Sequence, residues 1–141
     1  MLAMLILVDS REQKPYTFDG YRWTVKPLKI GDYSVSGYSK LIAVERKSRM
    51  DWCSCLTKAG WPRFIKQLER MSELRCGLLV VESNLWDRNI FGQMPAGARM
   101  HRALEIVLNY VPVLFAGNRS GGKSATLAFL KLAKAKVDRW Q

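Results

Sequence analysis

Two acidic residues and a lysine in the first third of the chain have the types and spacing of a metal-dependent hydrolytic site. Asp32 follows Gly31, and Glu45 and Lys47 stand two residues apart in a run with the pattern of a strand. A period of two places Glu45 and Lys47 on one face of that strand, and a hairpin would bring Asp32 close to Glu45. Carboxylates suit Mg²⁺ or Mn²⁺, and such an ion polarises a phosphate and activates water. The lysine can orient that water and offset charge on the phosphoryl group.

Further charged residues surround this set. Asp9 and Glu12 stand at the end of an apolar run with Arg11 between them, and Asp51 follows Lys47 by four residues. Carboxylates gathered so closely repel one another unless a cation neutralises them. An isolated Glu-x-Lys pair is common on a solvated strand, so the prediction of a site depends on this accumulation of acids.

The elements that must position these residues form a β-rich first half and an alternating second half. Apolar or alternating runs predict strands over residues 2–8, 21–28, 33–36 and 41–46, with a hairpin turn at 37–40. Later patterns predict a helix carrying Trp61, Phe64, Ile65, Leu68 and Met71, a strand over 77–82, irregular structure over 86–95, a helix carrying Met100, Ala103, Leu104, Val107 and Leu108, a strand over 111–116 and a helix over 124–136. This order predicts an α/β fold, a central mixed β-sheet flanked by helices.

Composition points to a folded domain with a polyanionic partner. The chain has 141 residues, of which 48% are hydrophobic, which suits one domain with a core and excludes a disordered chain. Basic residues number 23 against 12 acidic ones, a net charge of +11, which favours nucleic acid over membrane as the partner. Three cysteines and the absence of a signal-peptide or membrane-span pattern predict free thiols and an intracellular location.

Three motif blocks occur in order along the chain: V-D-x-R-E at residues 8–12, G-D-Y at 31–33 and E-R-K-x-x-x-D at 45–51. Together they resemble the nuclease domain of the XPF family of structure-specific endonucleases, and Arg63, Phe64 and Gln67 resemble the helix that follows. The likeness implies a restriction-endonuclease-like PD-(D/E)xK fold and hydrolysis of DNA phosphodiester bonds. We expect residues 1–141 to form a single XPF-type nuclease domain without the helix-hairpin-helix domain that XPF-type enzymes usually carry.

The resemblance also implies roles for individual residues. Asp32 and Glu45 would bind Mg²⁺ or Mn²⁺ together with the backbone carbonyl of Arg46, and Lys47 would position the water. Asp9 and Glu12 would line the site and help to hold a second ion, and Asp51 would support the lysine or an arginine. The expected DNA-binding residues are Arg11, Arg46, Arg63, Gln67, Arg119 and Lys123. The implied partners are branched, flap or junction DNA, bound largely independently of sequence, and a second copy of the chain, since the late helices are apolar.

A competing motif lies near the end of the chain. Residues 117–124 satisfy G-x-x-x-x-G-K-[ST] between a predicted strand and a predicted helix, which is the local context of a nucleotide-binding loop. The segment alternatively forms a glycine turn in which Ser124 caps the last helix, or a turn whose amides, Arg119 and Lys123 hold a DNA phosphate. The alternatives to a nuclease are therefore a nucleotide-binding protein and a non-catalytic XPF-like DNA-binding scaffold.

Overall fold

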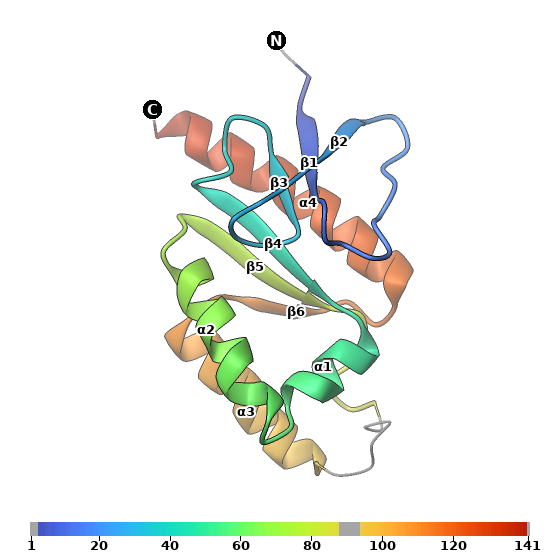
Figure 1. Ribbon diagram of the computed structural model, residues 1–141, viewed down its shortest axis with the longest axis vertical. Helices are drawn as coiled ribbons and strands as arrows, with labels where there is room; N and C mark the ends of the chain where they lie inside the picture. The colour runs from blue at the N-terminus through green and yellow to red at the C-terminus, as the bar shows by residue number, and fades with distance from the viewer. Residues whose placement is uncertain (1–2, 88–93, 141) are drawn as a thin grey trace.

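The structure, a computed structural model, describes residues 3–87 and 94–140. Its centre is a mixed sheet with the strand order β2-β1-β3-β4-β5-β6 (Figure 1). The strands are β1 (Leu5–Asp9), β2 (Arg22–Lys26), β3 (Tyr33–Val35), β4 (Ile42–Lys47), β5 (Cys76–Val81) and β6 (Val113–Phe115). The helices are α1 (Arg49–Cys55), α2 (Gly60–Ser72), α3 (Ala96–Asn109) and α4 (Arg119–Arg139). The predicted α/β fold with a mixed sheet flanked by helices is confirmed.

The direction of β3 makes the sheet mixed. This short strand pairs antiparallel with both β1 and β4, whereas the pairs β1–β2, β4–β5 and β5–β6 are parallel. Tyr33 lies opposite Val44 in the β3–β4 pair, as the predicted hairpin requires. The hairpin therefore places the residue before Tyr33, which is Asp32, beside the end of β4.

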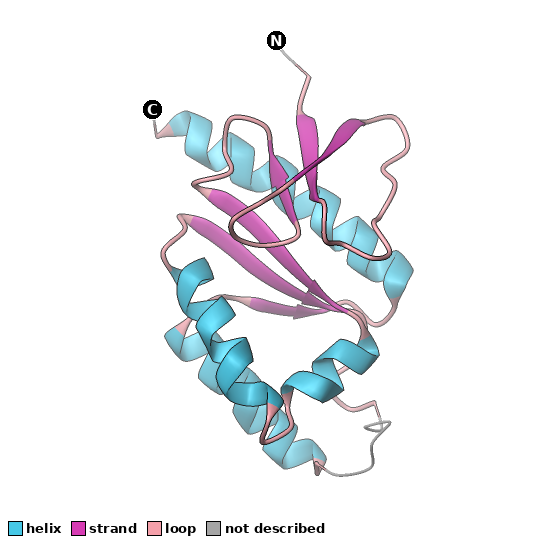
Figure 2. Cartoon of the chain, viewed as in Figure 1, coloured by secondary structure: helices cyan, strands magenta, loops and turns pink. Residues whose placement is uncertain are grey.

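Helices flank the sheet (Figure 2), and an apolar core lies on each of its two faces. On one face, Leu130, Ala133 and Val137 of α4 pack against Val8 and Val44. On the other face, α1, α2 and α3 contribute Trp52, Phe64, Leu68 and Ile106 among others. We call the first the α4 face and the second, which carries a cleft beside α2, the cleft face. Because side chains alternate along a strand, neighbouring residues of β4 serve opposite sides of the sheet.

The beginning of α4 corrects the prediction for residues 117–124. The helix starts at Arg119 with Asn118 as its cap, so the predicted cap at Ser124 is wrong. Asn118 accepts from the Gly121 amide through its side chain at 2.8 Å and from the Gly122 amide through its carbonyl at 2.9 Å. A nucleotide-binding loop needs such amides free to face phosphate oxygens. Residues 119–124 are helical, and the nucleotide-binding alternative loses its structural basis.

Other elements differ from the prediction in smaller ways. Helix α1, with Trp52 and Cys53 buried, is too short to show a periodic apolar stripe, and the sequence patterns did not reveal it. The predicted irregular segment 86–95 lies partly outside the described residues. None of the helices in residues 3–87 and 94–140 has the length and apolar character needed to cross a bilayer.

Gly31 allows the chain to turn sharply before Asp32. Its φ is +78°, and a Cβ atom there would lie 2.8 Å from the Ala43 Cβ. We expect Gly31→Ala to lower the free energy of unfolding, because it adds about 1–2 kcal/mol of backbone strain to about 1–3 kcal/mol of overpacking. Gly37→Ala is the matched control, since Gly37 has φ +87° with no atom within 4 Å of an added Cβ. Urea denaturation that showed equal losses in the two variants would contradict the predicted clash.

Candidate active site

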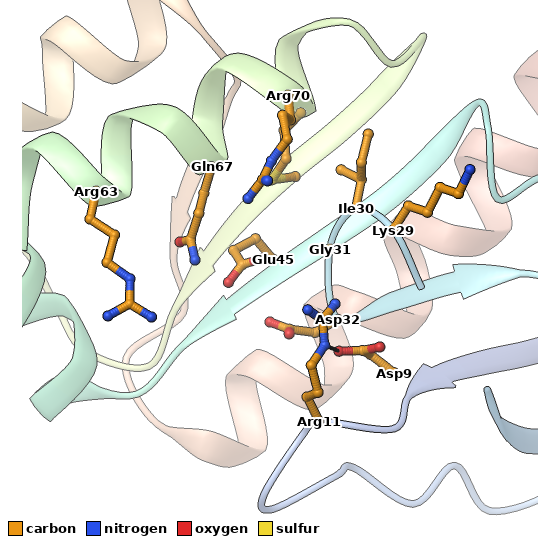
Figure 3. A pocket seen from close by; sticks show the side chains of 11 residues that line it. Asp9, Arg11, Lys29, Ile30, Gly31, Asp32, Glu45, Arg63, Gln67 and Arg70 are labelled. Carbon is orange, nitrogen blue, oxygen red and sulfur yellow. Dashed lines mark hydrogen bonds and ion pairs between the residues drawn. The ribbon is translucent and has the colours of Figure 1, made fainter. Parts of the chain in front are cut away.

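A cleft of about 290 Å³ opens on the cleft face, between α2 and the ends of β1, β3 and β4 (Figure 3). Acidic side chains from three different chain segments reach it: Asp9 from β1, Asp32 from the turn before β3, and Glu45 from β4. The other lining residues are Arg11, Lys29, Ile30, Gly31, Arg63, Gln67, Arg70 and Met71. The fold thus encloses a few acids within a largely cationic rim.

Asp32 is fixed by the backbone on both of its sides. Its amide donates to the Val44 carbonyl at 2.8 Å, and its carbonyl accepts from the Asp9 amide at 2.8 Å. Its side-chain Oδ2 accepts from the Arg46 amide at 2.8 Å. The carboxyl group therefore depends on the conformation of β4 for its position.

Glu45 and Lys47 lie together on the cleft face of β4, as the spacing of two predicted. The Lys47 Nζ lies 3.5 Å from the Glu45 Oε2, and the two side chains are only 13% and 12% exposed. Lys47 also donates to the Gln67 Oε1 at 3.4 Å and lies 5.2 Å above the centre of the Phe64 ring. It lines a hollow next to the cleft, and Arg63 and Gln67 line both. Helix α2 therefore holds the lysine against the acid.

The pKa values of Asp32, Glu45 and Lys47 reflect two acids that lie close together in a buried place. Burial, and then the charge of Glu45, raise the pKa of Asp32 well above that of an ordinary carboxyl. Burial also raises the pKa of Glu45, against the opposing charge of Lys47. Burial acts to lower the pKa of Lys47, but the negative groups around it, Glu45 first and then Cys55, outweigh burial and raise it. Lys47 therefore remains an ammonium, and Asp32 and Glu45 hold their protons to higher pH than ordinary carboxyl groups do.

This donor set fits a divalent cation of the Mg²⁺ type. Within the described residues, no three or more His, Cys, Asp or Glu side chains gather into a closed metal cage. Magnesium, however, is commonly bound by one or two carboxylates, with water and substrate phosphate filling the remaining positions. The raised pKa values of Asp32 and Glu45 also mark a place where positive charge is lacking. Two carboxylates beside an open cleft meet these requirements.

Asp9 lies at the cleft but is already engaged in hydrogen bonds. The side chain is 3% exposed, its Oδ1 accepts from the Leu28 amide at 2.8 Å, and its Oδ2 accepts from the Arg11 Nε at 2.9 Å. Arg11 also donates to the Leu28 carbonyl at 2.7 Å, and its side chain remains 73% exposed. In this arrangement Asp9 braces the loop that follows β1 and orients Arg11 at the rim of the cleft.

Glu12 and the Arg46 side chain belong to a different group, buried towards the α4 face. We name it the back-face cluster: Glu12, Tyr16, Arg46, Glu82 and Arg119. Arg46 donates to Glu12 at 3.1 Å and to both oxygens of Glu82 at 2.9 and 3.1 Å. Burial, and then the charge of Asp32, raise the pKa of Glu12. Glu12 therefore still interacts electrostatically with an acid of the cleft. The structure therefore does not place the Arg46 guanidinium in the cleft.

The motif residue Asp51 has a clear local role. It forms a capping box at the start of α1, in which the Asp51 amide donates to the Ser48 Oγ at 3.1 Å and the Asp51 Oδ2 accepts from the Ser48 amide at 3.2 Å. Asp51 also contributes to the raised pKa of Lys47, as a smaller influence than Glu45. The last position of E-R-K-x-x-x-D thus helps to cap the helix that follows β4.

The basic residues expected to meet DNA lie on two sides of the molecule. Arg63 and Gln67 line the cleft, whereas Arg119 and Lys123 belong to α4 on the opposite face of the sheet. Sequence reasoning missed Lys29 and Arg70 at the cleft, and Tyr16 and Glu82 behind it. The helical spacing of Arg63, Gln67 and Arg70 by four and three residues is a signal that could have identified Arg70. The acid Glu82, at the end of an apolar run, is a second such signal.

Comparison with known proteins identifies the family and the fold. The model of the ERCC4 domain matches residues 8–121. The structure is similar to XPF from Aeropyrum pernix, with a TM-score of 0.74 and 22% identity over 97% of this chain and 70% of that chain. It is also similar to XPF from Aeropyrum pernix in complex with DNA, with a TM-score of 0.72 and 22% identity over 96% of this chain and 66% of that one.

This chain thus spans about two thirds of the length of the DNA-bound XPF chain. A search of curated protein sequences gives no significant match. The resemblance to the XPF family, stated above from three motif blocks, is confirmed, and the chain belongs to the ERCC4 domain family.

Proposed function

We propose that this protein is a Mg²⁺- or Mn²⁺-dependent DNA endonuclease that hydrolyses phosphodiester bonds in branched, flap or junction DNA. The observation that carries the proposal is that Asp32 and Glu45 line one cleft with a cationic rim, and that Lys47 lies 3.5 Å from Glu45. The three residues come from motif blocks of the family to which the chain belongs. One structure with the same fold, XPF from Aeropyrum pernix, is in complex with DNA.

Asp32 and Glu45 would hold the divalent cation, joined by the backbone carbonyl of Arg46. When bound, the cation supplies Lewis-acid polarisation of the phosphate and a lowered pKa for water. The contribution of the chain is a pair of carboxyl groups whose positions are fixed before binding, Asp32 by the Arg46 amide and Glu45 by Lys47. Their raised pKa values mean that binding a cation displaces protons.

Lys47 would act as a hydrogen-bond donor. Its raised pKa keeps it charged, so it cannot serve as a general base at neutral pH. A buried ammonium held by Glu45 and Gln67 can instead orient a water or stabilise negative charge that develops on the phosphoryl oxygens. Gln67 lines the cleft and is the partner that holds Lys47 beside it.

The rim would hold the DNA backbone. Within the described residues, no hydrogen bond or ion pair occupies the side chains of Lys29, Arg63 or Arg70, which leaves them available to phosphate oxygens. Contacts of this kind do not read sequence, and they weaken as salt rises because bound counterions are released from the DNA. This supports a substrate recognised by backbone path and shape.

A second copy of the chain would cover the apolar outer surface of α3. Leu104, Val107 and Leu108 are 58%, 52% and 83% exposed there, and Leu114 on the edge strand β6 is 45% exposed. An apolar surface beside an unpaired strand edge favours association. We therefore propose a homodimer that uses α3 and β6.

The acids should be essential for cleavage but not for binding. We expect Asp32→Asn and Glu45→Gln each to lower the rate of cleavage of flap and junction DNA on the order of 100-fold or more. DNA affinity, measured by fluorescence anisotropy without divalent ions, should stay equal or increase, because each change removes a negative charge that faces phosphate.

Asp19→Asn, at an exposed acid outside the cleft, is the control and should behave as the wild type. A near wild-type rate in either site variant would show that these acids are not the site. Wild-type protein that binds these DNAs but cuts none of them with Mg²⁺ or Mn²⁺ would favour the non-catalytic scaffold.

The raised carboxyl pKa values make stability depend on pH. A carboxyl whose pKa is higher in the folded than in the unfolded protein stabilises the fold below its unfolded pKa, and this contribution is lost as pH rises through the folded pKa. Metal-free protein should therefore lose stability as pH increases from about 4 to about 8, and Asp32→Asn should lose less. Thermal unfolding in EDTA measures this directly. Identical pH slopes for the two proteins would refute the assignment.

The proposed dimer can be tested through its apolar surface. We expect the double variant Leu104→Lys with Leu108→Lys to sediment as a monomer while the wild type sediments as a dimer, because an interface would have to bury two unpaired ammonium groups. Leu132→Lys is the matched control, since Leu132 is a 71% exposed leucine on α4. A monomeric wild type at micromolar concentration would exclude the dimer.

A further inference from the structure

We propose that Glu82 is a positioning residue for the active site, acting across the sheet through Arg46. In this role the Glu82 carboxylate holds the Arg46 guanidinium on the α4 face, and the Arg46 amide holds Asp32 at the cleft. The catalytic consequence rests on the proposed nuclease function, whereas the structural coupling does not.

The contact between Glu82 and Arg46 is bidentate and buried. The Arg46 Nε donates to the Glu82 Oε2 at 2.9 Å and its NH2 group donates to the Oε1 at 3.1 Å. The two side chains are 8% and 7% exposed. The Glu82 amide also donates to the Lys47 carbonyl at 2.9 Å, so backbone and side chain both tie Glu82 to the end of β4. A planar two-point contact of this kind fixes orientation as well as distance.

The coupling to the cleft follows from the alternation of β4. Arg46 points to the α4 face, while its neighbours Glu45 and Lys47 point to the cleft. The Arg46 amide is the donor to the Asp32 Oδ2 at 2.8 Å. A movement of Arg46 would therefore shift all three residues proposed for the chemistry.

The surroundings of Glu82 leave it little freedom to move. The Tyr16 hydroxyl donates to the Glu82 Oε2, and two guanidinium groups contact the Tyr16 ring, Arg46 at 5.4 Å and Arg119 at 4.8 Å from its centre. Arg119 also lies 4.0 Å from the Glu82 Oε2. These contacts bring the N-terminal loop, β4, β5 and α4 to one point.

Gly122 shows why this region of α4 needs glycine. A Cβ atom on Gly122 would collide with the Tyr16 hydroxyl and come within 3.1 Å of the Glu82 Cγ. Gly122, the second required glycine of the apparent nucleotide-binding motif, thus leaves space for the back-face cluster. The proposal therefore accounts for a sequence feature that the nuclease site leaves unexplained.

Glu82 and Glu12 differ in the number of hydrogen bonds that they accept from Arg46. The back-face cluster holds two arginines and two glutamates, and Glu82 accepts two hydrogen bonds from Arg46 whereas Glu12 accepts one. Removal of the Glu82 charge leaves a buried guanidinium without its main partner, and Arg46 must then shift or become hydrated. The largest effect on Asp32 is accordingly expected at Glu82.

The test compares Glu82→Gln with Val137→Ala in the full chain. Val137 is 1% exposed on α4, so its truncation lowers stability without touching the back-face cluster. In Glu82→Gln we expect hydrogen exchange of the Arg46 amide, followed by NMR, to accelerate about tenfold beyond any change in global stability. We expect kcat for DNA cleavage to fall about 10- to 100-fold with little change in KM. Tyr16→Phe should show the same changes in smaller degree.

The two readouts separate the possible outcomes. Val137→Ala should leave Arg46 exchange, corrected for global stability, and kcat per folded molecule unchanged. If Glu82→Gln matched Val137→Ala in both readouts, Glu82 would be only a stabilising residue and the proposal would be overturned. If the wild type cleaved no DNA, the proposed function would fail, and the exchange of the Arg46 amide would still decide the coupling.

Discussion

Two carboxyl groups, Asp32 and Glu45, are held close together in a largely buried place, where their charges oppose one another. Burial penalises each charge and proximity increases the penalty, so the pKa values of both acids rise. Such an arrangement is unfavourable by itself and persists only because the surrounding fold fixes it. The turn at Gly31, the amide of Arg46 and the ammonium of Lys47 are the local means of holding it.

Strand β4 serves both faces of the sheet with successive residues. Glu45 and Lys47 lie on the cleft face, and Arg46 between them enters the back-face cluster. Because the side chains of a strand alternate in direction, a buried anchor on one face fixes reactive groups on the other at the same point of the chain. The positions of the three residues in the block E-R-K are therefore coupled to one another.

The basic side chains have different roles on the two faces of the sheet. At the cleft, Lys29, Arg63 and Arg70 have no hydrogen-bond or ion-pair partner in the part of the chain that the structure describes, which suits a polyanion that must approach a site of negative charge. On the α4 face, Arg46 and Arg119 are engaged with Glu82 and Tyr16. A net charge of +11 thus includes cations that brace the fold and cations that remain available at the surface.

The sequence by itself determined the mixed α/β architecture, the family and the pairing of Glu45 with Lys47, because periodicity and motif spacing are local properties of the chain. It did not distinguish the roles of residues that share a motif. Asp51 caps α1 and Asp9 is occupied by Arg11 and Leu28, although both stand in family blocks beside the acids of the cleft.

Only the tertiary structure could decide these roles, because they depend on contacts between residues far apart in the chain. Glu82 meets Arg46 across 36 positions, and Gly122 faces Tyr16 and Glu82 from the last helix. The match of residues 117–124 to a phosphate-binding pattern failed for the same reason. The pattern specifies residue types, whereas in the structure Gly121 and Gly122 lie inside α4, which packs against the back-face cluster.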